Sequence, residues 1–530
     1  MTELKRVFMV DGKPFYPLGS QFLDISGYSV RDASETDAAF EGLKRAHGNT
    51  ALFPVNWDEV EPKEGKFNFT SVDVLLAKAR RYGVKLMLLW FGTWKCTWMD
   101  YTPAWVKTNP QRFKRVISST GDALWILSSH CPANFEADKK AFTALCKYLK
   151  AKDSAEHTVI GIQVENESGI IGSDRDYGPV GQAVFDSPVP AKLLSSMKAA
   201  GKGRVYDIWQ QTGGKKSGTW PELFGWSAGE LMTAWSFANY IDGLAEAGKA
   251  AHDIPMFINV WPKEGERPWS IPGEDYPSGG GDTMMLDIFK WFTPHVDLIA
   301  PDLNLRNPSA YESMCAAYAR DDNPLFTPES DGSPNMLRGI ADYNAIGFFA
   351  WIRPVIAEDG SIDPISKEAS DIIRCVAAVI PLLLKYQGTG QVHAVIEEED
   401  MTSQRFDFDG YLGRVTFGRI INPFGRRREQ IGSTRGWGLV IQASRNEFYL
   451  VGANYRLFLR PKLPPEKMLA STLSRAYRSG PKDRYLTVEE GHFAQNGKFQ
   501  VECRHNGGEL DQGVWVDADA GVVVRVIMCD

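Results

Sequence analysis

The feature that most constrains the fold is a regular alternation of short apolar runs with amphipathic helical stretches over about the first 350 residues. Residues 84–90 are apolar at nearly every position, which is typical of a parallel strand that is covered on both faces. Residues 72–79, just before this run, carry apolar side chains at helical spacing, and Gly83 then provides a common helix stop. Such alternation predicts helices packed around a parallel sheet.

Apolar runs of this kind recur along the chain at intervals that leave room for helices. They are residues 15–22, 50–55, 84–90, 159–164, 256–260, 296–300, 325–327 and 346–351. Helical patterns separate them, for example over 36–47, 229–251 and 310–319. This number of strands predicts an α/β fold, a (β/α)8 TIM barrel with enlarged loops. A doubly wound open sheet is the alternative that the pattern leaves open.

The character of the sequence changes beyond about residue 385. Segments such as 438–442 and 521–526 are rich in β-branched and aromatic residues and are separated by turn residues, which predicts an all-β, sandwich-like domain. We therefore expect a barrel domain over residues 1–384 and a β-rich accessory domain over residues 385–530. The basic cluster at 426–428 is interpreted as a solvated turn.

Composition and short motifs exclude several classes of protein. The 59 basic and 66 acidic residues give a net charge of −7, so no basic excess exists for binding nucleic acid. The 7 cysteines form no C-x-x-C pair and no H-E-x-x-H occurs, which argues against a disulfide framework and a zinc site. The N-terminus lacks the apolar run of a signal peptide, and no stretch reaches the ~18 apolar residues of a membrane span. We expect a cytoplasmic protein.

Two of the predicted strands are followed by carboxylates, in the position where barrels place their reactive groups. The fourth strand ends in the sequence QVENE at 163–167, and Glu329 follows the seventh. Glycoside hydrolysis needs such a pair, because one carboxyl protonates the departing oxygen while the other attacks the sugar or activates water. Glu165 and Glu167 lie two residues apart, so strand alternation predicts both on one face.

The sequence Gln163-Val164-Glu165-Asn166-Glu167 resembles the Q-V-E-N-E motif of glycoside hydrolase family 35, the β-galactosidases of clan A. This resemblance implies that Glu167 is the acid/base, that Asn166 binds the 2-hydroxyl of the sugar, and that Glu329 is the nucleophile of a retaining enzyme. The segment around Glu329 looks closer to a family 42-like branch of the clan.

Two further motifs carry the same resemblance. Trp57 with EPKEGKFNF at 61–69, and PAWV at 103–106, are similar to elements that follow the second and third strands in families 35 and 42. The resemblance covers roughly residues 10–355. It implies a (β/α)8 barrel that hydrolyses β-glycosidic bonds.

Aromatic and polar residues near the strand ends are candidates for binding the sugar, because aromatic faces stack on flat apolar surfaces. The tryptophans are Trp57, Trp90, Trp94, Trp220, Trp261 and Trp351, each of which also suits the core. Trp351 is the preferred platform, since members of the clan often carry a tryptophan at the end of the eighth strand. Asn259 and Asp302 are interpreted as binding hydroxyl groups or capping their loops. Lys95 is interpreted as a solvated loop residue, with binding of a polar substituent of the sugar as the alternative.

One competing motif is the G-x-S-x-G sequence at 225–229, which matches the nucleophile elbow of serine hydrolases. That elbow needs a strand immediately before it, and residues 220–224 are short and contain proline. Ser227 and Glu230 also fit an S-x-x-E capping box at the start of the following helix. We interpret the motif as this cap.

The sequence as a whole predicts a retaining exo-β-glycosidase, a β-galactosidase that releases terminal β-galactose from oligosaccharides or glycosides. The alternatives are an exo-β-glucosaminidase or another β-glycosidase with the same site, and a non-catalytic carbohydrate-binding barrel. The chemistry requires no metal and no organic cofactor. The expected partner is a small sugar substrate, with no nucleic acid and no membrane, and a homo-oligomer is left open.

Overall fold

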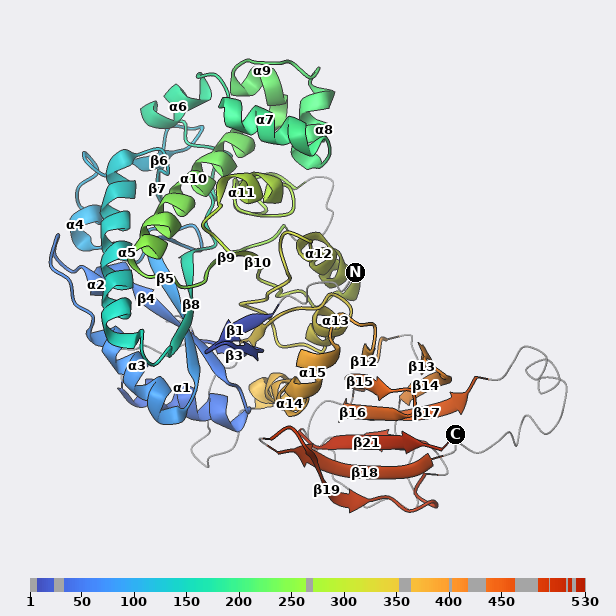
Figure 1. Ribbon diagram of the computed structural model, residues 1–530. Helices are drawn as coiled ribbons and strands as arrows, with labels where there is room; N and C mark the ends of the chain where they lie inside the picture. The colour runs from blue at the N-terminus through green and yellow to red at the C-terminus, as the bar shows by residue number, and fades with distance from the viewer. Residues whose placement is uncertain are drawn as a thin grey trace.

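The structure is a computed structural model with a barrel surrounded by helices and a β-sandwich beside it (Figure 1). It describes residues 7–22, 33–263, 270–351, 364–399, 403–417, 435–462, 485–494, 496–510, 513–516 and 521–529. The basic cluster at 426–428 lies outside these residues.

The centre of the first part is a sheet of 7 parallel strands in the spatial order β10-β9-β8-β5-β4-β3-β11. These are β3 (Leu18–Gln21), β4 (Thr50–Asn56), β5 (Lys85–Lys95), β8 (Val159–Asn166), β9 (Met256–Val260), β10 (Leu298–Pro301) and β11 (Phe348–Ala350). Segment 325–330 lies between the two outer strands of this sheet, β10 and β11, and closes the barrel. The backbone N–H of Leu303 donates to the carbonyl of Glu329 at 2.8 Å, and that of Phe349 to Thr327 at 2.9 Å. The predicted barrel is confirmed, and the open-sheet alternative is wrong.

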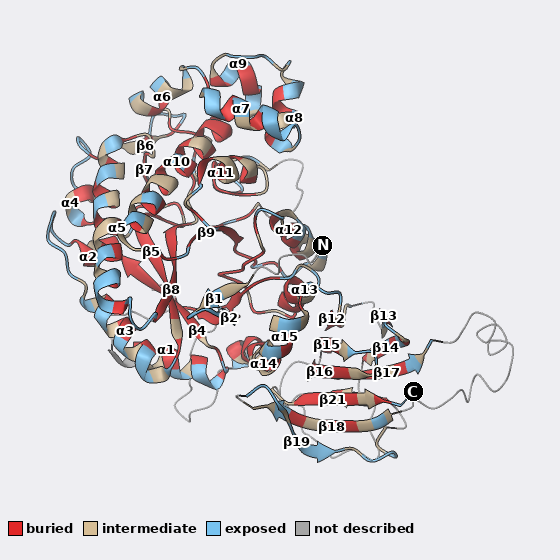
Figure 2. Cartoon of the chain, in the orientation of Figure 1, coloured by how far each residue is buried: buried red, intermediate tan, exposed pale blue. Residues whose placement is uncertain are grey.

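Helices cover the outside of the barrel, and their inward faces are buried while their outward faces are exposed (Figure 2). They are α1 (Ala33–Arg45), α2 (Trp57–Val60), α3 (Thr70–Tyr82), α4 (Ala104–Lys107), α5 (Pro132–Asp153), α6 (Pro179–Phe185), α7 (Ala191–Ala200), α8 (Arg204–Gln211), α9 (Trp220–Phe224), α10 (Ala228–Ala251), α11 (Leu286–Phe292), α12 (Pro308–Tyr318) and α13 (Met336–Ala341). Helix α3 ends at Gly83, whose φ of 66° is left-handed, as the sequence predicts. Helices α6 to α9 form an insertion between β8 and α10 (Figure 1).

Two short hairpins complete this part of the molecule. Strands β1 (Phe8–Val10) and β2 (Lys13–Phe15) pack against the apolar interior of the barrel. The rings of Phe8 and Phe326 lie 5.4 Å apart, so the hairpin covers the interior at the amino-terminal ends of the strands. Strands β6 (Arg115–Ile117) and β7 (Ala123–Leu127) lie in the long loop after β5.

Helix α10 begins at Ala228, as predicted, but the capping box that was expected there does not form. Ser227 makes no side-chain capping bond, and its φ and ψ of −83° and 1° lie outside the extended region that such a cap uses. Glu230 is buried and accepts a hydrogen bond from the hydroxyl of Tyr276 at 2.8 Å. The elbow is absent as well, because a helix rather than a strand precedes residues 225–227.

The C-terminal part consists of two antiparallel sheets, in the orders β12-β15-β16-β21-β18-β19 and β13-β14-β17-β20. Their strands are β12 (Val392–Ile396), β13 (Ser403–Phe408), β14 (Tyr411–Phe417), β15 (Trp437–Ser444), β16 (Glu447–Ala453), β17 (Tyr455–Pro461), β18 (Tyr485–Phe493), β19 (Phe499–Arg504), β20 (Val514–Val516) and β21 (Val523–Met528). The prediction of an all-β C-terminal region is confirmed. The division of the chain at residues 384 and 385 stays a prediction.

Helices α14 (Pro364–Ala378) and α15 (Ile380–Tyr386) lie between the barrel and the larger sheet (Figure 1). Strand β15 shows why this sheet is apolar on both faces. Leu439 belongs to a core shared with the helices and the barrel strand β3, whereas Val440 belongs to the core between the two sheets. No helix among the described residues is long and apolar enough to cross a membrane.

Candidate active site

The carboxyl ends of the barrel strands surround a cavity of about 270 Å³. Its lining consists of Lys95, Cys96, Glu167, Trp261, Pro262, Asp302, Asn304, Leu305, Glu329 and Trp351. These residues follow or end strands from β5 round to β11, including segment 325–330. The cavity therefore lies at the end of the barrel where active sites are built.

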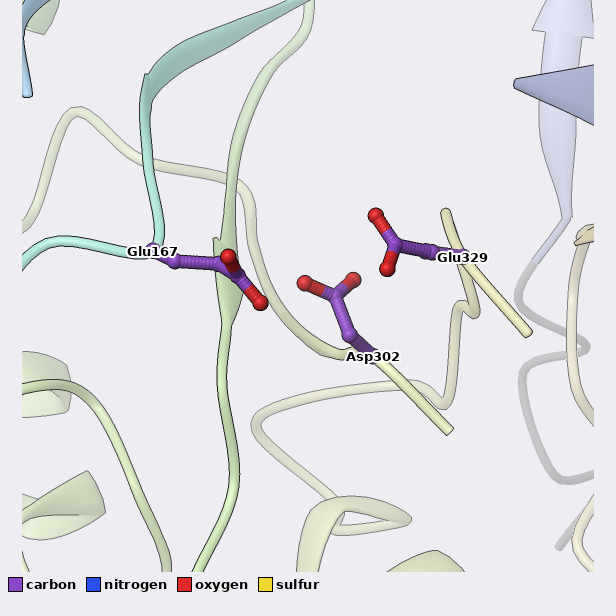
Figure 3. Close-up of side chains that lie close together, drawn as sticks. All are labelled: Glu167, Asp302 and Glu329. Atoms are coloured by element: carbon purple, nitrogen blue, oxygen red, sulfur yellow. The ribbon is translucent and has the colours of Figure 1, made fainter. Parts of the chain in front are cut away.

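Three carboxyl groups converge in this cavity, from Glu167, Asp302 and Glu329 (Figure 3). One oxygen of each lies within 4.8 Å of the other two. The structure thus brings together the two glutamates that the sequence singles out. Asp302, which the sequence suggests as a hydroxyl-binding residue, has its carboxyl group between them (Figure 3).

Glu329 is buried and is held by two amide donors. Gln21 Nε2 donates to its Oε2 at 2.8 Å, and Asn304 Nδ2 donates to its Oε1 at 2.9 Å. Burial and the neighbouring Glu167 raise the pKa of Glu329 to about 7, against the lowering effect of Lys95 and the two amides. Both donors favour the ionised form that a nucleophile needs.

Asn259 connects the other two carboxyl residues, although it does not line the cavity. Its Oδ1 accepts a hydrogen bond from the backbone N–H of Glu167 at 2.9 Å, and its Nδ2 donates to Asp302 Oδ2 at 2.7 Å. Asn166 is also buried, with its Oδ1 accepting from the backbone N–H of Cys96 at 3.2 Å. These two amides position the ends of β8 and β5.

Lys95 and Cys96 bring a cation and a thiol to the cavity. Lys95 is only 6% exposed, so its interpretation as a solvated loop residue is wrong. The reason is that β5 continues five residues beyond the apolar run, to Lys95 itself. Its Nζ donates to Cys96 Sγ at 2.6 Å. Although burial opposes it, Cys96, Glu167 and Glu329 raise the pKa of Lys95, while burial raises the pKa of Cys96 to about 12.

Glu165 does not share a face with Glu167, so that prediction is wrong. Both residues have a left-handed φ, 62° for Glu165 and 45° for Glu167, and this breaks the alternation of the strand. Glu165 is fully buried and accepts hydrogen bonds from the backbone N–H groups of Trp94 at 2.7 Å and Thr93 at 3.2 Å. Burial and the adjacent Asp138 raise the pKa of Glu165.

Two of the six candidate tryptophans reach the cavity. Trp261 and Trp351 are each 38% exposed and line it. The other four are fully buried and belong to the barrel core: Trp57, Trp90, Trp94 and Trp220. The expectation that these four form walls of the sugar pocket is therefore not met.

The segments 61–69 and 103–106 that carry the family resemblance build the support behind the cavity. Glu61 accepts hydrogen bonds from Trp57 Nε1 at 3.1 Å and from the backbone N–H of Gly65 at 2.6 Å. The indole N–H of Trp105 donates to the carbonyl of Glu61 at 3.0 Å. Gly65 has a φ of 73°, which explains the glycine in the motif.

Several residues that line the cavity, and Gln21, which contacts Glu329 without lining it, were not predicted from the sequence. Gln21 is the last residue of β3, so the strand-end rule that found the glutamates also points to it. Asn304 follows the sixth strand by three residues and carries no comparable signal. Pro262, Leu305 and Cys96 line the cavity through loop geometry that the sequence pattern does not show.

Among the described residues, Glu167, Asp302 and Glu329 are the one set of side chains whose ligand atoms lie close enough to meet on a metal ion. The ammonium group of Lys95 lines the same cavity and would repel a cation. Gln21 and Asn304 already occupy both oxygens of Glu329. The donor set therefore suits acid–base chemistry better than metal binding.

A parallel barrel with two carboxyl groups at its mouth is an arrangement that can carry glycoside hydrolysis. Residues 32–212 match the family model of glycoside hydrolase family 42, described as β-galactosidase. Residues 373–517 match a second family model, described as a domain of unknown function (DUF5597). The chain thus carries a glycoside hydrolase domain that is similar to the β-galactosidases of family 42 over residues 32–212, and the matching model is of the family 42 type rather than the family 35 type.

Solved structures with a similar fold are distant in sequence. The catalytic domain of a β-amylase from Paenibacillus polymyxa is 12% identical, covers 67% of this chain and 96% of its own, and has a TM-score of 0.49. A β-galactosidase from the psychrophilic Marinomonas ef1 is 12% identical over 69% of this chain and 61% of its own, with a TM-score of 0.47. Similarity at this level says nothing about substrate. Among curated proteins, no sequence matches the chain.

Proposed function

We propose that the chain is a retaining exo-β-glycosidase that releases terminal β-galactose from oligosaccharides or glycosides. The observation that carries this proposal is the meeting of Glu167 and Glu329 in one buried cavity, with carboxylate oxygens within 4.8 Å. Retaining enzymes hold their carboxyl groups ~5–5.5 Å apart, and inverting enzymes ~6.5–9.5 Å apart. The nearest oxygens of the two carboxyl groups thus lie closer than the range of inverting enzymes, which supports retention.

In this mechanism Glu329 attacks the anomeric carbon while Glu167 gives its proton to the departing oxygen. The glycosyl ester on Glu329 is then hydrolysed by a water molecule that loses a proton to Glu167. The amides of Gln21 and Asn304 fix both oxygens of Glu329, which supports its role as the nucleophile. Trp261 and Trp351 are positioned to stack on the sugar.

The restriction to terminal residues and the identity of the sugar are supported by two different observations. The cavity of about 270 Å³ is small for an oligosaccharide and supports recognition of a single terminal residue. The family 42 match over residues 32–212 supports galactose as that residue. The similarity of residues 163–167 to the family 35 motif is consistent with the same pair of catalytic positions.

The test compares wild type, Glu167→Gln and Glu329→Ala on a panel of aryl β-glycosides that includes β-galactosides and β-glucosaminides. Each variant should lose at least about 10³-fold in kcat on the preferred sugar. Azide should partly rescue both, giving the α-glycosyl azide with Glu329→Ala and the β-glycosyl azide with Glu167→Gln. Glu136→Gln, which changes an exposed glutamate, is the matched control and should keep full activity.

Full activity of either cavity variant would refute the assignment. Preference for β-glucosaminides would keep the catalytic pair but replace galactose by glucosamine. Product analysis by NMR at short times tests retention directly, because a retaining enzyme first releases the β-anomer.

A further inference from the structure

Asp302 is the third carboxyl group of the cavity, and the two-carboxylate mechanism gives it no role. It follows the last residue of β10 and is 3% exposed, with its backbone N–H bonded to the carbonyl of Val260 at 2.9 Å. Its Oδ2 accepts a hydrogen bond from Asn259 Nδ2 at 2.7 Å. Its Oδ1 is buried and receives no hydrogen bond from any described donor.

No donor among the described residues makes a hydrogen bond to the unpaired Oδ1 oxygen. Asp302 lies against the carboxyl group of Glu167, and the carboxyl of Glu329 is within 4.8 Å (Figure 3). Lys95 and Cys96 line the same cavity from the end of β5, and the phenol of Tyr318 on α12 is a further neighbour, whose hydroxyl donates to Gly281. A buried carboxylate oxygen without a donor is costly, and a proton on that oxygen removes the cost.

Electrostatics point the same way. Carboxylates that lie close together in a buried site repel one another, and this disfavours the ionisation of Asp302. Burial, with Glu329 and Glu167 as neighbours, raises the pKa of Asp302 well above its usual range, and the hydrogen bond from Asn259 opposes this only in part. Oδ2 is already occupied by Asn259, so a proton of Asp302 would sit on Oδ1, and Glu167 is the carboxyl group within hydrogen-bonding reach of Asp302.

We propose that Asp302 is a positioning residue that works in its protonated form and donates a hydrogen bond to Glu167. The proposal rests on the function of Glu167 as acid/base given above. Asn259 holds both partners, since it bonds the backbone of Glu167 and the side chain of Asp302. Asp302 thereby fixes the carboxyl of Glu167 against the departing oxygen.

The proton balance of the reaction shows when this hydrogen bond matters most. In the first step the proton of Glu167 moves to the leaving oxygen as its bond to the anomeric carbon breaks, and Glu329 forms the ester bond. Glu167 is then a carboxylate, and the O–H of Asp302, which keeps its own proton throughout, donates to it. In the second step Glu167 takes a proton from water, the resulting hydroxide bonds to the anomeric carbon, and Glu329 leaves as a carboxylate.

The test uses the full chain with Asp302→Asn and Asp302→Ala. Asparagine has one oxygen to accept from Asn259 and one NH₂ group to donate to Glu167, so it imitates the protonated acid. The kcat of Asp302→Asn should stay within about threefold of the wild-type value at neutral pH. If ionisation of Asp302 lowers the wild-type activity at high pH, this decrease should be absent in Asp302→Asn. Asp302→Ala should lose about 10- to 100-fold in kcat, because a hydrogen bond to a charged group is lost. Asp282→Asn changes another buried acid that does not line the cavity and should leave the pH profile unchanged.

Aryl glycosides with good and poor leaving groups separate positioning of Glu167 from general damage to the fold. Asp302→Ala should be impaired most with poor leaving groups, which need the acid. An Asp302→Asn variant as inactive as Asp302→Ala would overturn the proposal, because it would mean that Asp302 works as a carboxylate. Wild-type rates and pH profile in Asp302→Ala would overturn it too. If Glu167→Gln is fully active, the proposed function itself fails, so the two failures are distinguishable.

Discussion

The mouth of the barrel and the core beneath the larger C-terminal sheet are both buried, but they bury opposite kinds of group. The mouth holds Asp302 and Glu329 together with Lys95, whereas the core beneath the sheet is built from residues such as Ile372 and Leu439. Burying charge costs free energy, and burying apolar surface gains it. The comparison teaches that one region of this chain is arranged for chemistry and the other for stability.

Backbone conformation shows the same contrast. Four non-glycine residues with left-handed φ values lie at the ends of β5 and β8, beside the cavity: Cys96, Thr97, Glu165 and Glu167. Four others lie elsewhere in the described barrel part: Asp11, His47, His157 and Asn344. In the described part of the C-terminal sandwich, only Asn454 has such a value. Strained backbone of this kind persists where the surrounding structure fixes it, and it gathers at functional sites.

The largest expected effect separates the two regions directly. Glu329→Ala should reduce kcat by about 10⁴-fold or more, because it removes the nucleophile. It should leave the melting temperature equal or raise it, because a carboxyl whose burial raises its pKa is removed. Steady-state kinetics and thermal unfolding at pH 8 measure both. A melting temperature several degrees lower would show that Glu329 also holds the fold together and would break the contrast.

The reverse pattern is expected for Leu439→Ala. Leu439 is fully buried in the core that joins β15 to the helices and the barrel, so its truncation should cost about 3 kcal/mol of unfolding free energy. The kcat per folded molecule should not change, because the side chain is not part of the cavity. Urea unfolding and activity titration measure these quantities. Leu486→Ala, at a position 63% exposed, is the control and should stay within about 0.5 kcal/mol of wild type.

The sequence predicted the architecture and the meeting of two glutamates at the mouth for a common physical reason. Apolar periodicity reports which segments are buried, and the strand-end rule then places Glu167 and Glu329 at one mouth. Side-chain direction could not be obtained this way. Glu165, whose φ is positive, lies beside Asp138 of the outer helix α5 rather than in the cavity, and Lys95 is buried because β5 extends beyond the apolar run. Neither the backbone conformation of Glu165 nor the length of β5 can be predicted from the spacing of apolar residues.

Tryptophans show the same limit of sequence reasoning. Trp57 and Trp90 lie near strand ends, as Trp261 and Trp351 do, but they point into the core, where their indole N–H groups donate to Glu61 and Asp138. The acceptor of Trp57 lies 4 residues along the chain, whereas the acceptor of Trp90 lies 48 residues away in sequence. Such partners become visible only in the folded chain.

Glu230 and Asp282 form a buried pair of acids outside the cavity, where burial of charge should affect stability without affecting activity. Burial and the neighbouring Asp282 raise the pKa of Glu230 to about 8, and burial raises that of Asp282 to about 6. Both values exceed those of the unfolded chain, so the folded state binds more protons, and stability falls as the pH rises from about 4 to 8. Glu230→Gln keeps an acceptor for Tyr276 and removes the charge. It should raise the unfolding free energy at pH 8 by about 2 kcal/mol.

The measurement for this pair is chemical unfolding of both proteins at pH 5 and pH 8. At pH 5 the two should be nearly equal, because Glu230 is then protonated in the wild type. Activity should not change at either pH, since Glu230 does not line the cavity. An equal gain at both pH values would mean that charge is not the cause. In that case the burial of Asp302 and Glu329 at the mouth would also not be expected to lower the free energy of unfolding.

The smallest expected effect follows from removing the positive charge of Lys95 at the mouth of the barrel. Lys95 lowers the pKa of Glu329, which burial and Glu167 raise to about 7. Activity requires ionised Glu329, so kcat/KM should rise with pH through a limb near 7. Lys95→Met removes the charge, so that limb should move to higher pH by about one unit, with about a tenfold loss below it and little loss above it. Lys95→Arg keeps the charge and should leave the limb in place. If the acidic limb of the kcat/KM profile of Lys95→Met stays at the wild-type pH, the ammonium group does not lower the pKa of Glu329. Burial of Lys95 at the mouth would then have to serve binding or folding.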